Sequence, residues 1–475
     1  MTDLWKKSAT DLAAGIRDRE FSSEELVRAT LARIEALDKR TNSFAIVDAE
    51  GALNFAREAD KALRAGGATG PLHGLPVTVK DVIATKGIRT AYGSRLYKDN
   101  VPAADPEAIA RVKRAGGIIL GKTTSPEFAH KILTDSPLHG ITRNPWSLGH
   151  SCGGSSGGAG AASAMGFAPL HVTTDGGGSS RVPAACCGVV GLKPTMGSVP
   201  NETSQDLFGL QVLGTIARTV ADVKLLYQTM AGPFAGDPMT AGGAAVEPVP
   251  LGGDPAAVLK GLRVRYFPLM GNQRVDTEVA AITKGMVDAM AAAGAQVFEA
   301  GDIDWAADAW RVYMRAQQAQ RFRSTMDKVR DQLDPSMVMC IEEGLAQSAA
   351  ELQAAMQERS GLFRRLQAAF TTADIFVSPI VAAPPIKATH LAHEPIIING
   401  RDEGPLRKSW YNYVIPLNGS GHPAMSVPCG RTAAGLPLGL QVAGPWRSEP
   451  LLLRVAAALE ALRPWAQDWP PAAEA

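Results

Sequence analysis

Two pairs of serines flanked by glycines are the residues of this 475-residue chain whose types and spacing suggest chemistry. Ser155 and Ser156 lie in the run GGSSGG, and Ser179 and Ser180 lie in the run GGGSSR. Glycine adopts backbone angles that other residues cannot, and it lets a ligand approach the main chain closely. Consecutive glycine N–H groups can also point at one spot, as in an oxyanion hole. The runs predict an accessible serine beside an anion site, and the apolar segment AGAASAMGFAPLHV between them disfavours the alternative of two flexible linkers.

A lysine in an apolar stretch is the second candidate for chemistry. Lys80 ends the segment PVTVK, which is strand-like and is preceded by a Gly-Leu-Pro turn signal. A buried lysine is unfavourable unless it is paired or used. The alternative is a structural lysine whose aliphatic stem reaches past the strand to solvent. The pattern therefore singles out Lys80 as a residue that needs a partner.

The order of these residues resembles the amidase signature family. That family has a strand lysine usually followed by Asp, then a GGSSGG run, then a D-x-G-G-S-x-R run. In this chain Ser155 follows Lys80 by 75 positions, and Ser179 follows Ser155 by 24 positions. Further pieces of the family pattern recur over nearly the whole chain, as TRNPW at 142–146, VGLKPT at 190–195, ARTVAD at 217–222 and GLPLGLQ at 435–441.

The resemblance implies amide hydrolysis through an acyl-enzyme and a role for each polar residue. Ser179 attacks the carbonyl, Lys80 is the ultimate base, and Ser155, which the family holds on a cis peptide bond, relays the proton. Lys80 accepts a proton at neutral pH only if its pKa falls well below about 10.4, and burial acts in that direction. Asp175 and Arg181 are interpreted as hydrogen-bonding supports of the nucleophile turn. Four backbone N–H groups are expected to hold the developing oxyanion, those of Gly176, Gly177, Gly178 and Ser179.

Other assignments of the chemistry stay open at this point. One alternative is that the second serine of each pair, Ser156 and Ser180, forms the reactive pair instead of Ser155 and Ser179; we call this the alternative register. A Ser-His-Asp triad is the rival mechanism, but the segment GSSGG only approaches the G-x-S-x-G elbow that it needs. Thiol chemistry is a further alternative to small buried cysteines at three positions, Cys152, Cys186 and Cys187. The family often has proline where Cys152 stands, so the entry to the first serine turn is expected to differ.

The segment between the lysine strand and the first serine run forms part of the acyl-side wall in the family. Here that wall and the segment after the second run supply the substrate-binding candidates Phe128, Ala129, His130, Ile132, Leu133, Leu207 and Phe208. Such residues favour a small neutral amide with apolar or aromatic groups. Cleavage of carbamates is a more remote expectation, taken from urethane-cleaving family members. The alternatives are the glutaminase-type A subunit of a tRNA-dependent amidotransferase and a non-catalytic binding protein on the same scaffold.

Composition sets the class of protein. The chain is 45% hydrophobic and 20% charged, with a formal net charge of +1. This composition is typical of a globular protein, and the near-zero charge argues against nucleic acid or an anionic membrane as partner. The five cysteines form no C-x-x-C pair and the histidines show no metal spacing, so we expect no cofactor and no metal. The sequence predicts a cytoplasmic monomer or homodimer without a signal peptide or a spanning helix.

The elements that must position these residues indicate an α/β fold. Strand-like segments at 74–83, 118–120, 171–174, 262–267, 375–377, 425–427 and 438–442 alternate with helical patterns. This alternation predicts one domain over 1–475, built on a large mixed, mainly parallel sheet with helices on both faces. Helical patterns at 275–293, 304–330 and 345–372 predict a lid or an oligomer face at about 270–372. We expect a surface loop at 232–261 and a loose tail at 470–475.

Overall fold

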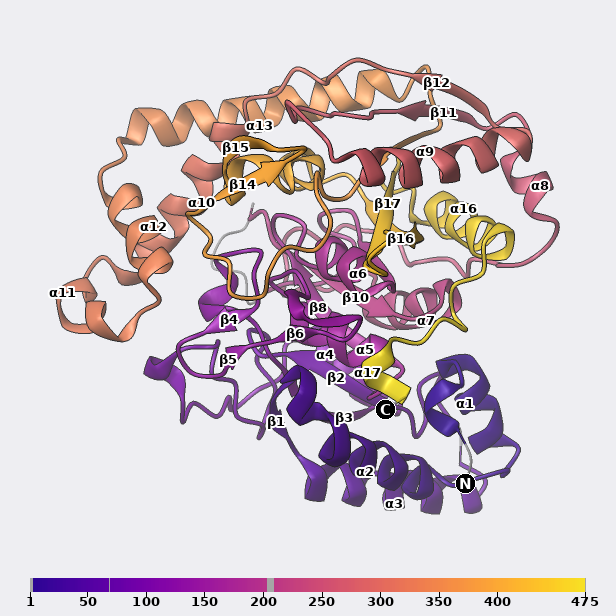
Figure 1. Ribbon diagram of the computed structural model, residues 1–475. Coiled ribbons are helices and arrows are strands. Elements are labelled where there is room, and N and C mark those ends of the chain that lie inside the picture. Colours follow the sequence, from indigo (N-terminus) through magenta and orange to yellow (C-terminus); the bar gives the residue numbers. More distant parts are fainter. Residues whose placement is uncertain (1–2, 68, 203–208, 475) are drawn as a thin grey trace.

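The protein is built around one large sheet, seen in Figure 1 with helices on both of its faces. The computed structural model describes residues 3–67, 69–202 and 209–474. The sheet has 11 strands, in the spatial order β1 (Phe44–Val47), β3 (Ile118–Thr123), β2 (Pro76–Lys80), β8 (Leu170–Asp175), β10 (Val212–Ala217), β9 (Val190–Lys193), β16 (Ala424–Arg431), β17 (Pro437–Ala443), β13 (Ile375–Pro379), β11 (Arg263–Tyr266) and β12 (Gln296–Glu299).

Parallel pairing is confined to two blocks of this sheet. Strands β3, β2 and β8 form one block and β13, β11 and β12 form the other. The strands between the blocks pair antiparallel, from β8 through β10, β9, β16 and β17 to β13. The expected large mixed α/β sheet is confirmed, with parallel pairing in part: four of its strand pairs are parallel and six are antiparallel. Its first parallel block carries both the lysine strand and the strand that leads to Ser179.

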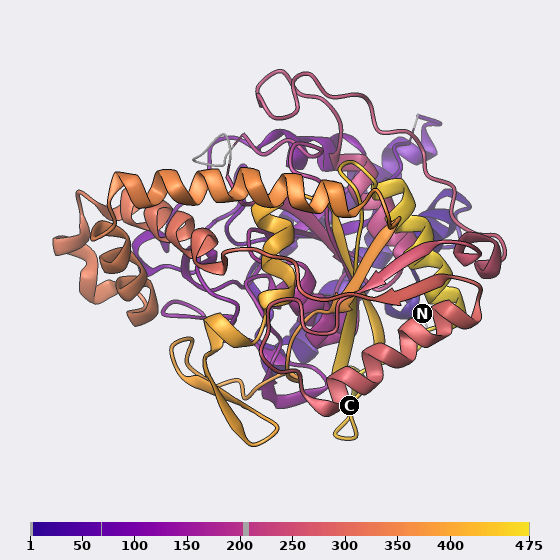
Figure 2. The same cartoon turned by 90° about the horizontal axis from the view of Figure 1, so that it is seen from above.

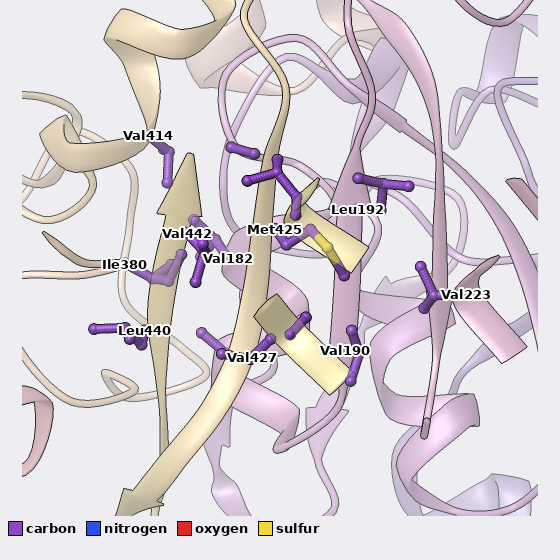
Figure 3. Close-up of a cluster of buried hydrophobic side chains, with 14 of the residues drawn as sticks. Val182, Val190, Leu192, Val223, Ile380, Val414, Met425, Val427, Leu440 and Val442 are labelled. Atoms are coloured by element: carbon purple, nitrogen blue, oxygen red, sulfur yellow. The ribbon is translucent and has the colours of Figure 1, made fainter. Parts of the chain in front are cut away.

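Apolar residues fill the space between the sheet and its helices. Figure 3 shows the central part of this core, where side chains of β9, β16 and β17 meet those of the neighbouring helices. The labelled residues are almost fully buried: Val182, Val190, Leu192, Val223, Ile380, Val414, Met425, Val427, Leu440 and Val442. Because both faces of the central strands are covered, these strands read as nearly continuous apolar runs rather than alternating ones. The core therefore fixes the sheet from which the polar residues of the site project.

The first half of the chain supplies helices with clear starting signals. Ser8 caps α1 (Ala9–Arg17), and Ser22 forms a capping box with Glu25 at the start of α2 (Ser23–Thr41). Thr219 caps α7 (Val220–Met230). Pro106 occupies the N-cap position of α4 (Glu107–Arg114). The remaining helices of this half are α3 (Ala49–Arg64), α5 (Gly157–Ala164) and α6 (Arg181–Cys187).

Small elements interrupt two segments that were expected to be irregular. The stretch 123–146 contains strands of two small hairpins, β4 (Asp135–Ser136) with β5 (Gly140–Ile141) and β6 (Arg143–Asn144) with β7 (Ser147–Ser151). The predicted loop 232–261 contains one short helix, α8 (Pro255–Leu259), with Asp254 as its N-cap. Both segments otherwise stay outside the large sheet.

The region 270–372 is mainly helical; its segment 326–345 projects at the left of the molecule in both views, whereas 277–292 lies toward the right (Figures 1 and 2). It contains α9 (Thr277–Ala292), α10 (Ala307–Phe322), α11 (Met326–Val329), α12 (Pro335–Leu345) and the long α13 (Ala349–Ala369). Helix α12 was missed, because its start lies in a gap between two predicted helices, where Asp334 caps it. Helix α10 packs between α12 and α13, so it is buried on two sides.

The last part of the chain completes the sheet and then folds back on the N-terminal helices. It contains the hairpin β14 (Pro395–Ile398) and β15 (Arg401–Pro405), followed by α14 (Leu406–Ser409), α15 (Ile415–Ser420), α16 (Glu449–Leu462) and α17 (Pro471–Glu474). The prediction of a loose tail was wrong. Ala472 and Ala473 are buried, and their carbonyl oxygens accept hydrogen bonds from Arg40 and Arg33 of α2. These long-range donors cannot be recognised from the composition of the tail.

Candidate active site

Lys80 stands at the carboxyl end of strand β2, where every residue from Pro76 to Lys80 is buried. Its Nζ lies 2.7 Å from the Ser155 Oγ and 2.9 Å from the Thr174 Oγ1. Strand β8 runs parallel beside β2, with Val79 opposite Val172, so the ends of both strands meet at one edge of the sheet. The partner that a buried lysine requires is therefore the first serine of the GGSSGG run.

Burial sets the protonation state of Lys80. Loss of hydration lowers the pKa of this lysine to about 7, although the Asp175 carboxylate acts in the opposite direction. A lysine with this pKa is largely neutral above pH 7 and carries a free lone pair there. Lys80 can therefore accept a proton at slightly alkaline pH, which an ordinary lysine cannot do.

Ser155 is placed by an unusual turn between the small hairpins and helix α5. The peptide bond between Gly154 and Ser155 is cis, as the resemblance to the family implies. A side chain at position 154 would lie 2.6 Å from the backbone of Ile132, so only glycine fits there. Ser155 is fully buried, and it lines a cavity. The GGSSGG run is a packed turn, and the flexible-linker alternative is wrong.

Ser179 lies in the turn that joins β8 to α6. Its exposed fraction is 6%, and it lines the same cavity as Ser155, Gly176 and Gly177. Gly178, just before it, has a φ of 102°, which favours glycine. The two serines are 24 positions apart in the sequence, but helix α5 and strand β8 between them bring both to one cavity.

The second serine of each pair points elsewhere. The Ser156 hydroxyl donates to the Thr174 carbonyl oxygen at 3.3 Å, and the Ser180 hydroxyl lies 2.7 Å from the Thr173 Oγ1. Both residues are fully buried, and neither lines the cavity. The alternative register, with Ser156 and Ser180 as the reactive pair, is therefore wrong.

Asp175 and Arg181 clamp the turn that carries Ser179. Both side chains are fully buried and form a bidentate ion pair with N–O distances of 3.0 Å. Burial alone would raise the pKa of Asp175, but the Arg181 guanidinium holds it well below its ordinary value. Asn418 and Gln441 accept further hydrogen bonds from Arg181. The predicted role of Asp175 and Arg181 as supports of the turn agrees with these contacts, since neither residue lines the cavity.

The expected role of the Gly178 N–H as an oxyanion donor needs correction. The backbone N–H of Gly178 donates to the Asp175 Oδ1 at 2.8 Å. This amide is engaged in holding the turn, because the carboxylate also accepts from the N–H of Ser180. Gly178 is therefore part of the support, while Gly176 and Gly177 border the cavity beside Ser179.

We expect Asp175→Asn to destabilise the protein by about 3–5 kcal/mol, because it leaves the buried Arg181 charge uncompensated. Urea unfolding at pH 7 measures this loss. The folded-state pKa of Asp175 is depressed, so its contribution to stability is present above the unfolded pKa and falls as the pH drops below it. The exposed pair Lys284–Asp288 provides a matched control, since Asp288→Asn is expected to change stability by about 1 kcal/mol or less. Equal effects of the two substitutions would contradict the support role.

A cavity of about 480 Å³ opens above the two serines. Four predicted wall residues line it, namely Phe128, Ala129, His130 and Ile132. Leu133 does not; it is 2% exposed and packs in the main core. Leu207 and Phe208 lie outside the described residues, so their placement stays a prediction. The sequence segment after the lysine strand therefore does supply one wall of the cavity.

Another part of the wall comes from helix α10, which lies in the region expected to form a lid or an oligomer face; none of its residues was predicted to line the site. The Trp310 indole N–H donates to the Gly176 carbonyl oxygen at 3.0 Å, and its ring packs against Gly177. The other lining residues of this helix include Tyr313, Met314, Gln317, Gln318 and Arg321. Their spacing of three and four residues marks one face of the helix, and it is the signal from which they could have been found.

The wall is more polar than the sequence indicated. The guanidinium of Arg321 lies 4.8 Å from the centre of the Phe128 ring, in a cation–π arrangement. Tyr92 stacks on Phe128 with ring centres 6.0 Å apart, and it meets Tyr97 edge-on with ring centres 5.3 Å apart. Both tyrosines line the cavity. The cavity thus combines an aromatic corner with the Arg321 guanidinium, which lies over the Phe128 ring.

A histidine base has no support in this geometry. His130 alone among the eight histidines lines the cavity that holds Ser155 and Ser179. Its Nδ1 lies 2.8 Å from the Glu127 carbonyl oxygen and its Nε2 lies 2.7 Å from the Ser336 Oγ. Both ring nitrogens are therefore occupied away from the serines. The Ser-His-Asp alternative is not formed by the described residues.

The cysteines are small buried residues. All five are free and buried, and burial raises the pKa of Cys152 to about 12. The Cys152 thiol donates weakly to the Thr142 carbonyl oxygen at 3.4 Å. A thiol with this pKa is not ionised at neutral pH, so it is a poor nucleophile.

Iodoacetamide is accordingly expected to leave amidase activity unchanged at pH 8. Protein that is first unfolded in urea should take up label on all five cysteines, which is the control for reagent quality. Activity and intact mass are measured on the same samples. Rapid inactivation with one label on Cys152 would show that this thiol borders the site.

Within residues 3–67, 69–202 and 209–474 no group of three or more His, Cys, Asp and Glu side chains gathers in a way that could hold a metal ion. In the same ranges no helix is both long and apolar enough to cross a membrane.

Comparison with known proteins agrees with this site. The model of the family described as Amidase matches residues 25–453. The acylamidase of Rhodococcus erythropolis is 35% identical over 469 residues, which cover 98% of this chain and 97% of that protein. The A subunit of a glutamyl-tRNA(Gln) amidotransferase from Roseiflexus is also 35% identical, over 500 residues that cover 98% of each chain. The solved structure of a bacterial aryl acylamidase superposes with a TM-score of 0.89 at 26% identity, covering 97% of each chain.

The fold and these similarities define the class as a hydrolase that cleaves the C–N bond of linear amides. More particularly, the chain belongs to the amidase signature family. The family resemblance and the amide-hydrolase activity expected from the sequence are thus confirmed.

Proposed function

We propose that the chain hydrolyses amides with Ser179 as nucleophile, Ser155 as proton relay and Lys80 as base. The observation that carries this proposal is the 2.7 Å contact between the Lys80 Nζ and the Ser155 Oγ, at a lysine whose pKa is about 7. Neutral Lys80 takes the proton of Ser155, and Ser155 takes the proton of Ser179 as its oxygen bonds to the carbonyl carbon. When the C–N bond breaks, Ser155 gives one proton to the leaving nitrogen and recovers a proton from Lys80, which becomes neutral again.

The tetrahedral intermediate carries a negative charge that needs donors. We assign this role to the backbone N–H groups of Gly176, Gly177 and Ser179, because these residues border the cavity. Each such donor contributes about 2.7–4 kcal/mol to the transition state. Water then attacks the acyl-enzyme, and Lys80 with Ser155 again accepts the proton, which regenerates Ser179 and releases the acid.

Aromatic side chains favour an aryl group next to the scissile bond. Tyr92, Tyr97, Phe128, Trp310 and Tyr411 all line the cavity. Aromatic rings prefer stacked or edge-to-face contact with another ring, and such pairs are worth about 0.5–1.5 kcal/mol beyond the area that they bury. We therefore propose a neutral aryl amide as the preferred substrate; carbamates of similar shape are a narrower proposal.

The expected order of kcat/KM is acyl anilide first, N-aryl carbamate second and glutamine last, by about tenfold or more between first and last. Release of the aniline or of ammonia from the purified chain measures this order. Glutamine lacks the ring that the aromatic corner contacts. Faster hydrolysis of glutamine than of the anilide would favour the second candidate function, the glutaminase-type A subunit of an amidotransferase; the similarity to such a subunit supports this candidate. No turnover of any amide would favour a non-catalytic binding protein.

We also propose that the whole chain acts as one domain, with 270–372 forming a wall or lid of the site, in the cytoplasm and as a monomer or homodimer. Helix α10 supports the first part, because it lines the cavity. Five free cysteines support a reducing compartment. Limited proteolysis and light scattering test the domain and the oligomeric state.

A further inference from the structure

Helix α10 borders a second cavity besides the active-site cavity. Trp310, Met314 and Gln318 recur every four residues and line both hollows. Arg311 and Arg315, one position further round the helix, line only the second cavity, which has a volume of about 260 Å³. The two hollows therefore adjoin along one ridge of α10, and they also share His130 and Tyr411.

Positive charge gathers in this second cavity. Its lining includes four cationic side chains and one carboxylate: Arg311, Arg315, Arg407, Lys408 and Glu343. Arg311 pairs with Asp308 at 2.7 Å, and Arg315 pairs with Glu343 at 2.7 Å. Among the described residues no carboxylate forms an ion pair with Arg407 or Lys408. Two of the four cations are therefore left without a counter-ion contact.

Two of the residues that line this cavity carry a buried donor without an acceptor. Arg311 is 8% exposed, and its Nε has no hydrogen-bond partner among the described residues; the same holds for the Nη2 of Arg407. The two side chains are linked, because the Arg311 Nη2 donates to the Arg407 carbonyl oxygen at 3.1 Å. A buried N–H without an acceptor is costly, so such groups mark a place where a ligand can bind.

The position of Arg407 relates this cluster to the active site. Burial raises the pKa of Tyr411 and of Cys340, and Arg407 is the group that most opposes the rise at each. Arg407 thus lies within electrostatic reach of Tyr411, which lines both cavities. The apolar part of the remaining walls comes from Met314, Met339, Ala392 and Pro405, beside polar side chains that include Gln318, Ser336 and His393.

We propose that this second cavity binds the carboxylate group of an organic acid, with Arg407 and Arg311 as donors and the apolar walls around its hydrocarbon part. A guanidinium matches a carboxylate in shape and charge, and the unpartnered N–H groups supply the hydrogen bonds. Each turnover of an amide hydrolase releases such an acid. The carboxylate belongs either to the remote end of an elongated substrate or to a separate acid molecule.

Calorimetric titration of the purified protein with benzoate tests the proposal, with benzyl alcohol as the uncharged comparison. Benzoate is expected to bind at least about tenfold more tightly than benzyl alcohol, and Arg407→Gln is expected to weaken benzoate binding about tenfold. Lys408→Gln is a second variant at an exposed position and should weaken it in the same direction. Arg323→Gln is the matched control, since it removes the same charge from an exposed position at the end of α10.

Hydrolysis of a neutral anilide keeps this test separate from the proposed catalytic roles, because Arg407 does not line the active-site cavity. That activity should be unchanged in Arg407→Gln, which also shows that the variant is folded. An anilide with a remote carboxylate distinguishes the two sources. About a tenfold loss of kcat/KM for this substrate alone assigns the carboxylate to the substrate, and an unchanged kcat/KM with weakened benzoate binding assigns it to a separate acid. Unchanged benzoate affinity in both variants, or equally tight binding of inorganic phosphate, would overturn the proposal.

Discussion

Ser179→Ala is expected to lower kcat for an acyl anilide by about 10⁴–10⁶-fold while leaving the fold intact. The substitution removes one hydroxyl from a turn that is held by Asp175 and Arg181 rather than by Ser179 itself. The free energy of unfolding should therefore stay within about 0.5 kcal/mol of the wild-type value. Initial rates of aniline release and a urea titration of the same preparation measure both effects.

Ser180→Ala is the matched control for this substitution. Ser180 is the next residue, it is fully buried, and its hydroxyl contacts Thr173 rather than the cavity. We expect this variant to lose some stability, about 1 kcal/mol, through the lost hydrogen bond and to retain most of its activity. Comparable loss of activity in the two variants would contradict the assignment of Ser179.

Lys80→Met is expected to lower kcat/KM by about 10²–10⁴-fold, the usual contribution of a general base. In the wild type, kcat/KM should rise with pH through about 7 and then level off, because Lys80 must lose its proton to accept one from Ser155. The residual activity of the variant should lack this rising limb. Rates between about pH 5.5 and pH 9.5 with one anilide measure the profile.

Lys122 offers a control of the same chemical type. It is fully buried in the neighbouring strand β3, and burial lowers its pKa to about 7 as well. Its Nζ donates to the Ile83 carbonyl oxygen and to the Thr85 Oγ1, away from the active-site cavity. Lys122→Met should therefore change stability but keep the rising limb of the pH profile. A lost limb in Lys122→Met, or a retained one in Lys80→Met, would contradict Lys80 as the base.

The order of short motifs along the chain singled out the three residues to which we assign catalytic roles. Lys80, Ser155 and Ser179 all lie at the ends of strands or in glycine turns, where local sequence decides both the conformation and the residue type. The clamp of Asp175 and Arg181 was predictable for the same reason, because both residues flank the turn. What the motif could not show is that Asp175 takes up the N–H of Gly178, since this depends on the direction of a side chain.

The substrate side of the site was much less predictable. Trp310 lies 134 positions from Gly176, to which it donates, and no local pattern connects the two. The pattern of 304–330 indicated helical structure, which the fold divides into α10 and α11. It did not show what the helix faces contact, because amphipathic spacing is the same for a lid, a wall and an oligomer face. Leu133 shows the opposite error: it is apolar and close to true wall residues, yet it belongs to the core. Which apolar residues face a cavity is decided by packing between distant elements.

The most direct test of the Ser179–Ser155–Lys80 mechanism is the pH dependence of labelling by a fluorophosphonate, followed by intact mass and peptide mapping. This reagent reports the reactivity of the nucleophile without binding of an amide substrate or release of product. The proposed mechanism predicts one adduct, on Ser179, formed at a rate that rises through a single ionisation near pH 7 and is nearly abolished in Lys80→Met. An adduct on Ser156 or Ser180, or labelling of Lys80→Met at the wild-type rate with the same pH profile, would contradict it.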